Sequence, residues 1–402
     1  MADPVRQTVS AGVRVLHFSH TSLVSGAERS LLELLRAEPA IGIEPLVACP
    51  DGELAAEVAA LGLLRFALRG TTGSFKIHPI HTPRAATEAM AMALAVRRRA
   101  HAQRAEVIHA NTMQAGVITV LARRLGGPPC VCHLRDFLPR SRAGTAVRRV
   151  LRGADGLVAI SRHTAERLSP DWETSGVKIV ENAVDAERFD PARFDAPAAR
   201  AALGLPAAGP VLGMVAQITP WKAQSDAIRI LAALLAEFPE ARLLLVGETK
   251  FVSGATRHDN RAYLASLHTL ARELGVDGAV GFLGERRDVA EVLGACDLAL
   301  LPSWEEPFGR SAAEAMAMGL PVLATSIGGP AEVLEDGVTG RLLPPREPAL
   351  WAAAAAELLR DPAASKAMGK QAREVVVERF APARHAAGML AAYRAAFDSA
   401  AS

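Results

Sequence analysis

The 402-residue chain has few cysteines, few aromatic residues and little net charge. Its four cysteines, at positions 49, 130, 132 and 296, lack the two-pair spacing of a zinc site, so buried free thiols in a reducing compartment are predicted. Aromatic residues make up 4% of the chain, so its core must consist mainly of Ala, Leu and Val. A net charge of +2 argues against a dedicated nucleic-acid-binding protein.

Long hydrophobic runs are also missing from the sequence. No stretch approaches the ~18 uninterrupted apolar residues that a transmembrane helix needs. The first 20 residues lack the basic start and apolar run of a signal peptide. No tandem repeat of fixed short period is present, which argues against a solenoid. Together these features predict a cytoplasmic protein.

Short apolar runs alternate with longer amphipathic segments along the chain. They form two series, at residues 13–18, 44–49, 106–111, 129–134 and 156–161, and at 210–216, 242–247, 279–284, 296–303 and 321–326. Continuous apolar character is typical of strands buried on both faces, and thus of parallel sheets covered by helices. The alternation of such strands with helical segments predicts an α/β protein.

Two domains are predicted from the length and from a break in this pattern. The segment 181–210 is rich in Pro, Ala and Asp and contains no sustained apolar run. We therefore expect an N-terminal domain over residues 1–195 and a C-terminal domain over 196–382, each a doubly wound, Rossmann-like parallel sheet. A last helix, at about 383–402, could pack back on the first domain.

The stretch EEPFGRSAAE, residues 305–314, follows the predicted strand 296–303 and leads into a predicted helix at 309–318. Ligands of open α/β sheets bind at the carboxyl ends of strands, and free amides at a helix N-terminus bind anions. Glu306 in the loop and Glu314 in the helix add carboxylates that can accept from hydroxyl groups. The layout suits a nucleotide sugar, although a capped helix with an acid near its N-terminus would show the same pattern.

Glu306 and Glu314 stand in an E-x7-E arrangement, and the chain resembles the retaining glycosyltransferases of family four. The resemblance is strong over residues 210–345 and looser before residue 200. It implies the GT-B fold, in which two Rossmann-like domains face a central cleft. Further segments share it, at residues 25–34, 107–112, 158–168, 181–189 and 213–224.

This resemblance implies a role for each matching residue. Glu306 would contact hydroxyl groups of the donor sugar near the reacting centre, and Glu314 would accept from the ribose hydroxyls. Lys222 would offset the negative charge that grows on the leaving diphosphate. The other donor-binding positions would act through main-chain amides, with Gly26, Arg310 and Ser311 at the phosphates and Phe308 and Gly309 at the sugar.

The sequence also departs from the family pattern. Gln217 stands where the family usually has an arginine, five positions before its lysine, so half of the usual diphosphate clamp is in question. The family's histidine beside the sugar corresponds either to His133, by residue type, or to Arg135, by its spacing to Asp136. A structural role for His133 at the end of a strand is an equal alternative.

The reaction implied is transfer of a hexosyl group from a nucleoside diphosphate sugar, with a UDP-sugar as first choice and a GDP-sugar as second. No cofactor and no divalent metal are implied. No carboxylate is placed as a glycosyl nucleophile, which favours front-face attack in which the departing phosphate takes the acceptor's proton. The acceptor is not readable, and a small molecule is favoured. The alternative enzymes are a nucleotide-sugar epimerase or hydrolase of the same fold.

A basic region in the first domain suggests a further alternative. Residues 84–152 hold 13 basic and three acidic side chains. In the predicted helix 146–153, Arg148, Arg149 and Arg152 fall on the side opposite the apolar residues. Such a face could make weak peripheral contact with an anionic membrane and serve a lipid-linked acceptor. We favour a solvated face, because stable anchoring normally takes a second signal.

Overall fold

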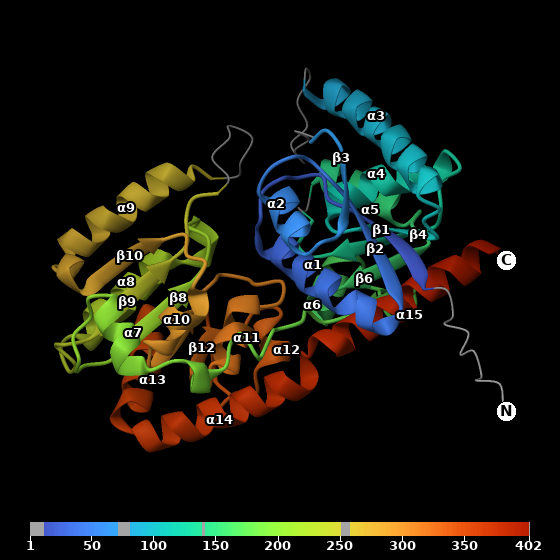
Figure 1. Ribbon diagram of the computed structural model, residues 1–402. Coiled ribbons are helices and arrows are strands. Elements are labelled where there is room, and N and C mark those ends of the chain that lie inside the picture. Colours follow the sequence, from blue (N-terminus) through green and yellow to red (C-terminus); the bar gives the residue numbers. More distant parts are fainter. Residues whose placement is uncertain (1–11, 71–80, 139–140, 251–257, 402) are drawn as a thin grey trace, which may run out of the picture. The chain divides into compact units, whose positions relative to one another are not determined.

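The computed structural model describes residues 12–70, 81–138, 141–250 and 258–401 (Figure 1). The chain divides into two compact units. Unit 1 comprises Met1–Ala183 together with Pro382–Ser402, and unit 2 comprises Val184–Ala381. Each unit is built on one parallel sheet, as the two series of apolar runs predict.

The sheet of unit 1 has seven parallel strands in the order β3-β2-β1-β4-β5-β6-β7. The strands are β1 (Val13–Phe18), β2 (Ile43–Cys49), β3 (Leu64–Ala67), β4 (Val107–Ala110), β5 (Cys130–Leu134), β6 (Gly156–Ala159) and β7 (Val177–Ile179). The helices are α1 (Gly26–Ala37), η1 (Glu38–Ile41), α2 (Glu53–Ala60), α3 (His81–Ala102), α4 (Met113–Arg124), α5 (Arg142–Leu151), α6 (Arg162–Leu168) and α15 (Pro382–Ala401).

Helices cover both faces of this sheet. Apolar side chains of α3 and α4, such as Ala93 and Ile118, form a cluster with residues of one face. On the other face, Val107 and Val131 belong to a cluster that includes Met389 and Tyr393 of α15. Because both faces are covered, the central strands are mostly apolar.

The sheet of unit 2 has six parallel strands in the order β10-β9-β8-β11-β12-β13. The strands are β8 (Val211–Val215), β9 (Arg242–Val246), β10 (Val280–Gly284), β11 (Leu298–Leu301), β12 (Val322–Thr325) and β13 (Arg341–Leu343). The helical segments are η2 (Pro191–Arg193), α7 (Ala196–Ala202), η3 (Pro220–Lys222), α8 (Gln224–Leu234), α9 (Asn260–Glu273), η4 (Asp277–Ala279), α10 (Val289–Gly294), α11 (Arg310–Ala317), α12 (Pro330–Val333), α13 (Pro348–Arg360) and α14 (Pro362–Arg379).

Each sheet contains one point where the strand order reverses. In unit 1 the reversal lies between β1 and β4, and in unit 2 it lies between β8 and β11. The loops that leave such a pair of strands diverge, which opens a crevice for ligands at the carboxyl edge of the sheet. Residues that follow these four strands are therefore the first candidates for a functional site.

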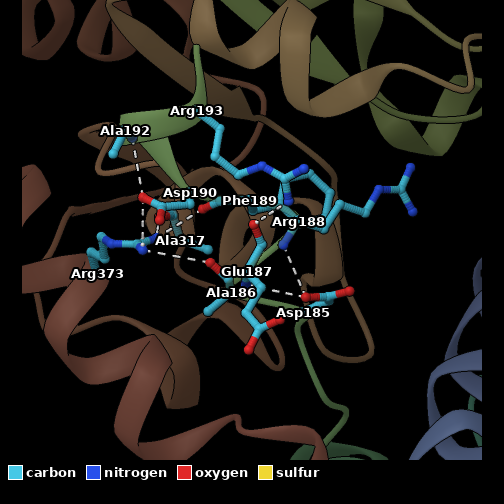
Figure 2. Close-up of polar contacts among 10 residues, drawn as sticks. All are labelled: Asp185, Ala186, Glu187, Arg188, Phe189, Asp190, Ala192, Arg193, Ala317 and Arg373. Atoms are coloured by element: carbon cyan, nitrogen blue, oxygen red, sulfur yellow. Dashed lines mark hydrogen bonds and ion pairs between the residues drawn. The ribbon is translucent and has the colours of Figure 1, made fainter.

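The chain passes into unit 2 after Ala183, earlier than the predicted boundary after residue 195. The amide of Val184 donates to the carbonyl of Phe380, 2.9 Å away. Figure 2 shows that Arg373 of α14 contacts the segment that follows Val184. Its Nη1 lies 2.8 Å from the carbonyl oxygen of Phe189, and its Nη2 lies 3.0 Å from the Asp190 carboxylate. Polar contacts of this kind leave no apolar pattern, so composition alone does not reveal them.

Candidate active site

The loop between β11 and α11 lies at the strand reversal of unit 2. The backbone of Glu306 forms a parallel bridge with that of Gly328, and the amide of Gly329 donates to the carbonyl of Glu306 over 2.8 Å. A Cβ on Gly328, whose φ is +98°, would lie 2.2 Å from the Glu306 oxygen. A Cβ on Gly329 would lie 2.3 Å from Cα of Phe308. Two glycines thus allow this loop to rest directly on the loop after β12.

Glu306 and Lys222 form a nearly buried ion pair in this loop region. The ammonium nitrogen of Lys222 lies 2.7 Å from each carboxylate oxygen of Glu306. It also lies 4.1 Å from the ring centroid of Trp221. The side chains of Lys222 and Glu306 are only 14% and 9% exposed. A cation and a carboxylate are therefore held together next to the N-terminus of α11.

The first turn of α11 presents main-chain amides beside this pair. Gly309 caps the helix with φ of +93°, a conformation that suits glycine. The amides of Arg310 and Ser311 belong to the first turn, where helices lack internal acceptors. Phe308 is buried, and its ring lies edge-on to Phe380 at 5.6 Å. The loop thus fixes where these amides lie.

Glu314, on the same helix, is paired with a different cation. Nε of Arg310 lies 2.8 Å from its carboxylate, across one turn of the helix. Glu314 is 8% exposed. The two carboxylates of the loop and helix therefore have separate partners.

Gln217 lies on the segment that follows β8. Its main-chain carbonyl accepts from Nε2 of Gln224 at 2.8 Å. Its main-chain nitrogen would lie 3.3 Å from a Cβ on Gly247, which follows β9. Gln217 therefore lies at the carboxyl edge of the sheet. In the loop after β11, the main-chain amide of Trp304 donates to the carbonyl of Trp221 over 2.9 Å, which joins this loop to η3.

Two polar features of this edge were not predicted from the sequence. The hydroxyl of Ser303, directly before the loop, is buried and has no hydrogen-bond partner among the described residues. The guanidinium of Arg346 stacks 4.0 Å from the ring centroid of Trp304. Arg346 is 42 residues beyond Trp304 in the chain, so no local pattern could have linked them.

In unit 1, Gly26 and Arg135 lie at the strand reversal. Gly26 is the first residue of α1, and no heavy atom would lie within 4 Å of a Cβ placed on it. Nε of Arg135 donates to Oδ1 of Asn111 at 3.0 Å, and Nη1 donates to Oδ1 of Asn182 at 2.6 Å. Nδ2 of Asn111 in turn donates to the carbonyl of Ala27 at 3.1 Å. Packing within unit 1 thus does not require glycine at position 26.

His133 lies elsewhere. It is fully buried on the face of the sheet that α15 covers, with its ring stacked between His109 and His385 at centroid distances of 5.4 and 5.9 Å. Burial, followed by the charge of Arg135, lowers its pKa well below the usual value. Arg135 and His133 are therefore two residues apart in sequence but have different surroundings.

Another histidine, His20, was missed by the sequence analysis although it follows β1. Its Nδ1 lies 3.0 Å from the hydroxyl of Thr112, which caps α4 by accepting from the amide of Ala115. Burial lowers the pKa of His20 to about 4, opposed by a hydrogen bond with Gln114. The imidazole is consequently neutral at pH 7.

All four cysteines are free and buried, as predicted. Within the described ranges, no group of three or more His, Cys, Asp or Glu side chains is arranged to hold a metal ion. No helix in the same part of the chain has both the length and the apolar character to cross a membrane.

Family models match most of the chain. The model described as "Glycosyltransferase Family 4" matches residues 24–188, and the model described as "Glycosyl transferases group 1" matches residues 195–375. The D-inositol 3-phosphate glycosyltransferase of Saccharomonospora viridis is 33% identical over 310 residues, which cover 72% of this chain and 70% of the relative. The protein of the same name from Salinispora arenicola is 32% identical over 320 residues, with 73% and 70% covered.

Solved structures are similar over nearly the whole length. Anabaena Alr3699/HepE, solved in complex with UDP-glucose, has a TM-score of 0.78 and 25% identity, with 94% of this chain and 98% of that chain covered. A glycosyltransferase from Rickettsia africae has a TM-score of 0.80, with 96% and 99% covered. At 19% identity, the latter is similar in fold alone.

Proposed function

We propose, from the premise that the chain belongs to glycosyltransferase family 4 and has the GT-B fold, that it transfers a hexosyl group from a nucleoside diphosphate sugar with retention of configuration. Family membership confirms the resemblance seen in the sequence. The observation that carries the finer proposal is the Lys222–Glu306 pair beside the first turn of α11. It combines a carboxylate for sugar hydroxyls with a cation and the main-chain amides of a helix N-terminus for a diphosphate.

A UDP-sugar is the donor we propose first, and a GDP-sugar second. Support comes from Alr3699/HepE, which is 25% identical and was solved with UDP-glucose. The diphosphate would be held by the amides of Arg310 and Ser311 and by Lys222. The amide of Gly26 is proposed as a further phosphate ligand. The amides of Phe308 and Gly309 would hold the sugar, and Glu314 the ribose.

In the proposed reaction, the bond between the anomeric carbon and the diphosphate oxygen breaks as the acceptor oxygen bonds to the same face. The acceptor's proton passes to the departing phosphate. Lys222 would stabilise the charge that develops on that phosphate, an effect that is usually a large part of catalysis. Glu306 would release the ammonium group to the diphosphate when the donor binds and would then accept from sugar hydroxyls. These positive groups make a divalent metal unnecessary in the proposal.

The acceptor is proposed to be a small molecule that binds unit 1. The similarity to D-inositol 3-phosphate glycosyltransferases makes an inositol phosphate the first acceptor to test. Of the two residues that could replace the family histidine, we propose Arg135. It shares the carboxyl edge with Asn111 and the first turn of α1, whereas His133 is enclosed between the sheet and α15.

Two measurements test the proposal. Thermal shift with UDP, GDP and ADP sugars should show the largest stabilisation with a UDP-sugar. Incubation with that sugar and D-inositol 3-phosphate in EDTA should give a glycoside whose anomeric configuration, read by NMR, matches the donor. Release of free sugar without an acceptor at the same rate would instead indicate the hydrolase or epimerase alternative, and strict dependence on a divalent ion would contradict the metal-free mechanism.

A further inference from the structure

Four histidines form a buried row inside unit 1. His17 lies on β1, His109 on β4, His133 on β5 and His385 on α15, and none is more than 3% exposed. His17 and His109 are direct partners in the register of β1 and β4. The ring centroids of successive members are 4.9, 5.4 and 5.9 Å apart. The row therefore connects the central strands with α15.

Much of the row lacks hydrogen bonds. Both ring nitrogens of His133, and Nε2 of His109 and of His385, are buried without a partner among the described residues. The other nitrogen of His385 lies 2.6 Å from the carbonyl oxygen of Glu181, and that of His109 lies 2.7 Å from the hydroxyl of Tyr393. Leaving buried polar groups unpaired costs stability, and a charged imidazole in the same place would cost much more.

The groups that face the row offer little compensation for added positive charge. Glu38, in η1, is the carboxylate in contact, 2.8 Å from Nε2 of His17 and 3.4 Å from the Tyr393 hydroxyl. Arg135, just beyond β5, brings a positive charge to the other end. Burial and then Arg135 lower the pKa of His133 and of His385, the latter to about 3, and burial and then His17 lower that of His109.

We propose that the histidine row makes the docking of α15 on the sheet of unit 1 a contact that acid releases. The strands of the row are joined by backbone hydrogen bonds, whereas α15 packs on them through side chains such as Met389 and Tyr393. Separating α15 from the sheet therefore costs less free energy than separating the strands, and it brings water to the imidazoles. This inference goes beyond the proposed function and does not depend on any donor or acceptor.

Linkage between proton binding and α15 docking gives the sign of the pH dependence. An exposed imidazole has a pKa of about 6.5, so a histidine whose pKa is lowered in the docked state takes up a proton on release. Docking therefore has its full stability above pH ~6.5 and weakens as the pH falls toward the docked-state pKa values. Uptake of three protons, by His109, His133 and His385, would raise the opening constant up to about a thousandfold per pH unit.

Hydrogen exchange of the full chain between pH 7.5 and 5 tests this. After correction for intrinsic rates, amides of α15 should lose more than about tenfold in protection per pH unit below 6.5, while those of α13, in unit 2, should change little. Equal losses in α15 and α13, or none in α15, would overturn the proposal. Amides of β1 and β4 losing protection in step with α15 would also overturn it, because unit 1 would then unfold as a whole.

A variant pair tests whether the row is the cause. His385→Gln keeps an amide that can donate to the Glu181 carbonyl but removes one titrating group, so the loss of α15 protection should become about tenfold shallower per pH unit. His268→Gln is the matched control, because His268 is exposed on α9 of unit 2 and should leave the profile unchanged. An identical slope in His385→Gln and wild type would refute the role of the row. If His385→Gln does not fold, the wild-type series decides alone.

Discussion

Two carboxylates eight positions apart, Glu306 and Glu314, each contact a cation of their own. Glu306 meets Lys222 from a distant part of the chain, and Glu314 meets Arg310 from the preceding turn. This separation at the residue scale supports separate roles, and each role can be tested by removing one side chain.

We expect Lys222→Ala to lower kcat for glycosyl transfer by about 10²–10³-fold, because one donor to a developing anion is worth roughly 2.7–4 kcal/mol. The substitution also leaves Glu306 buried without its cation, so stability should be measured alongside steady-state kinetics. Lys370→Ala, an exposed lysine of α14, is the control and should have wild-type activity. Unchanged kcat in Lys222→Ala would remove this residue from the mechanism.

Glu306→Ala should reduce turnover while leaving UDP affinity nearly intact. Glu314→Ala should instead weaken UDP binding by about tenfold or more, the value of a hydrogen bond to a charged group of roughly 1.5–3 kcal/mol. Calorimetric titration with UDP and initial-rate measurements on both variants separate the two effects. Equal effects on both quantities would contradict the division between sugar and ribose.

Gln217→Arg should tighten binding of the donor, because it restores the charge that the family usually has at this position and charge-assisted bonds are the stronger kind. The measurement is Kd for the UDP-sugar at low and moderate salt. An unchanged Kd would mean that another cation already has this role, and Arg346, stacked on Trp304, would be the first to examine.

Local patterns in the sequence were enough to predict the loop and helix that contain Glu306, Gly309 and Glu314. They could not predict that Lys222 pairs with Glu306, since these two residues are 84 positions apart. The histidine row was invisible for the same reason, because its members come from three strands and a distant helix. Residue type suggested His133 as a site residue. In the sequence, however, a histidine on the covered face of a strand cannot be told from one at the ligand-binding edge of the sheet.

At the scale of elements, short strands were the hardest to foresee. Three strands, β3, β7 and β13, contain only three or four residues each. Some of their residues are exposed or half-buried, so these strands form no continuous apolar run. The helix at 146–153 was predicted from its two faces, and α5 (Arg142–Leu151) confirms a helix there. Two of its arginines are engaged, since Nη2 of Arg148 donates to the carbonyl of Leu138 and Nη2 of Arg152 donates to the hydroxyl of Ser169, each at 3.1 Å.

For this helix we expect no co-sedimentation with anionic vesicles, even at low salt, because a few surface arginines give only weak, screened attraction of ~1 kcal/mol each. Neutral vesicles are the control. Binding that disappears at high salt, and in a variant with Arg148, Arg149 and Arg152 all replaced by Ala, would contradict this and support a lipid-linked acceptor.

At the scale of the whole molecule, unit 1 depends on a segment that follows unit 2. Deleting residues 382–402 should uncover Val107, Val131 and their neighbours, so unit 1 should lose its cooperative unfolding while unit 2 stays folded. Limited proteolysis should then leave a fragment close to Val184–Ala381. Val377→Ala, at an exposed site on α14, is the control. A truncated chain that resists proteolysis throughout would show that α15 is dispensable.

The place of α15 in the chain also sets an order for synthesis. The strands of unit 1 leave the ribosome first, but the helix that covers one of their faces is made only after the roughly 200 residues of Val184–Ala381. At about 5–20 residues per second, that face waits some 10 to 40 s for its cover. An uncovered apolar face invites aggregation in a nascent chain. His17, His109 and His133 place three polar rings on this face. The same side chains that lower the stability of the finished core should therefore make the uncovered face less prone to aggregation.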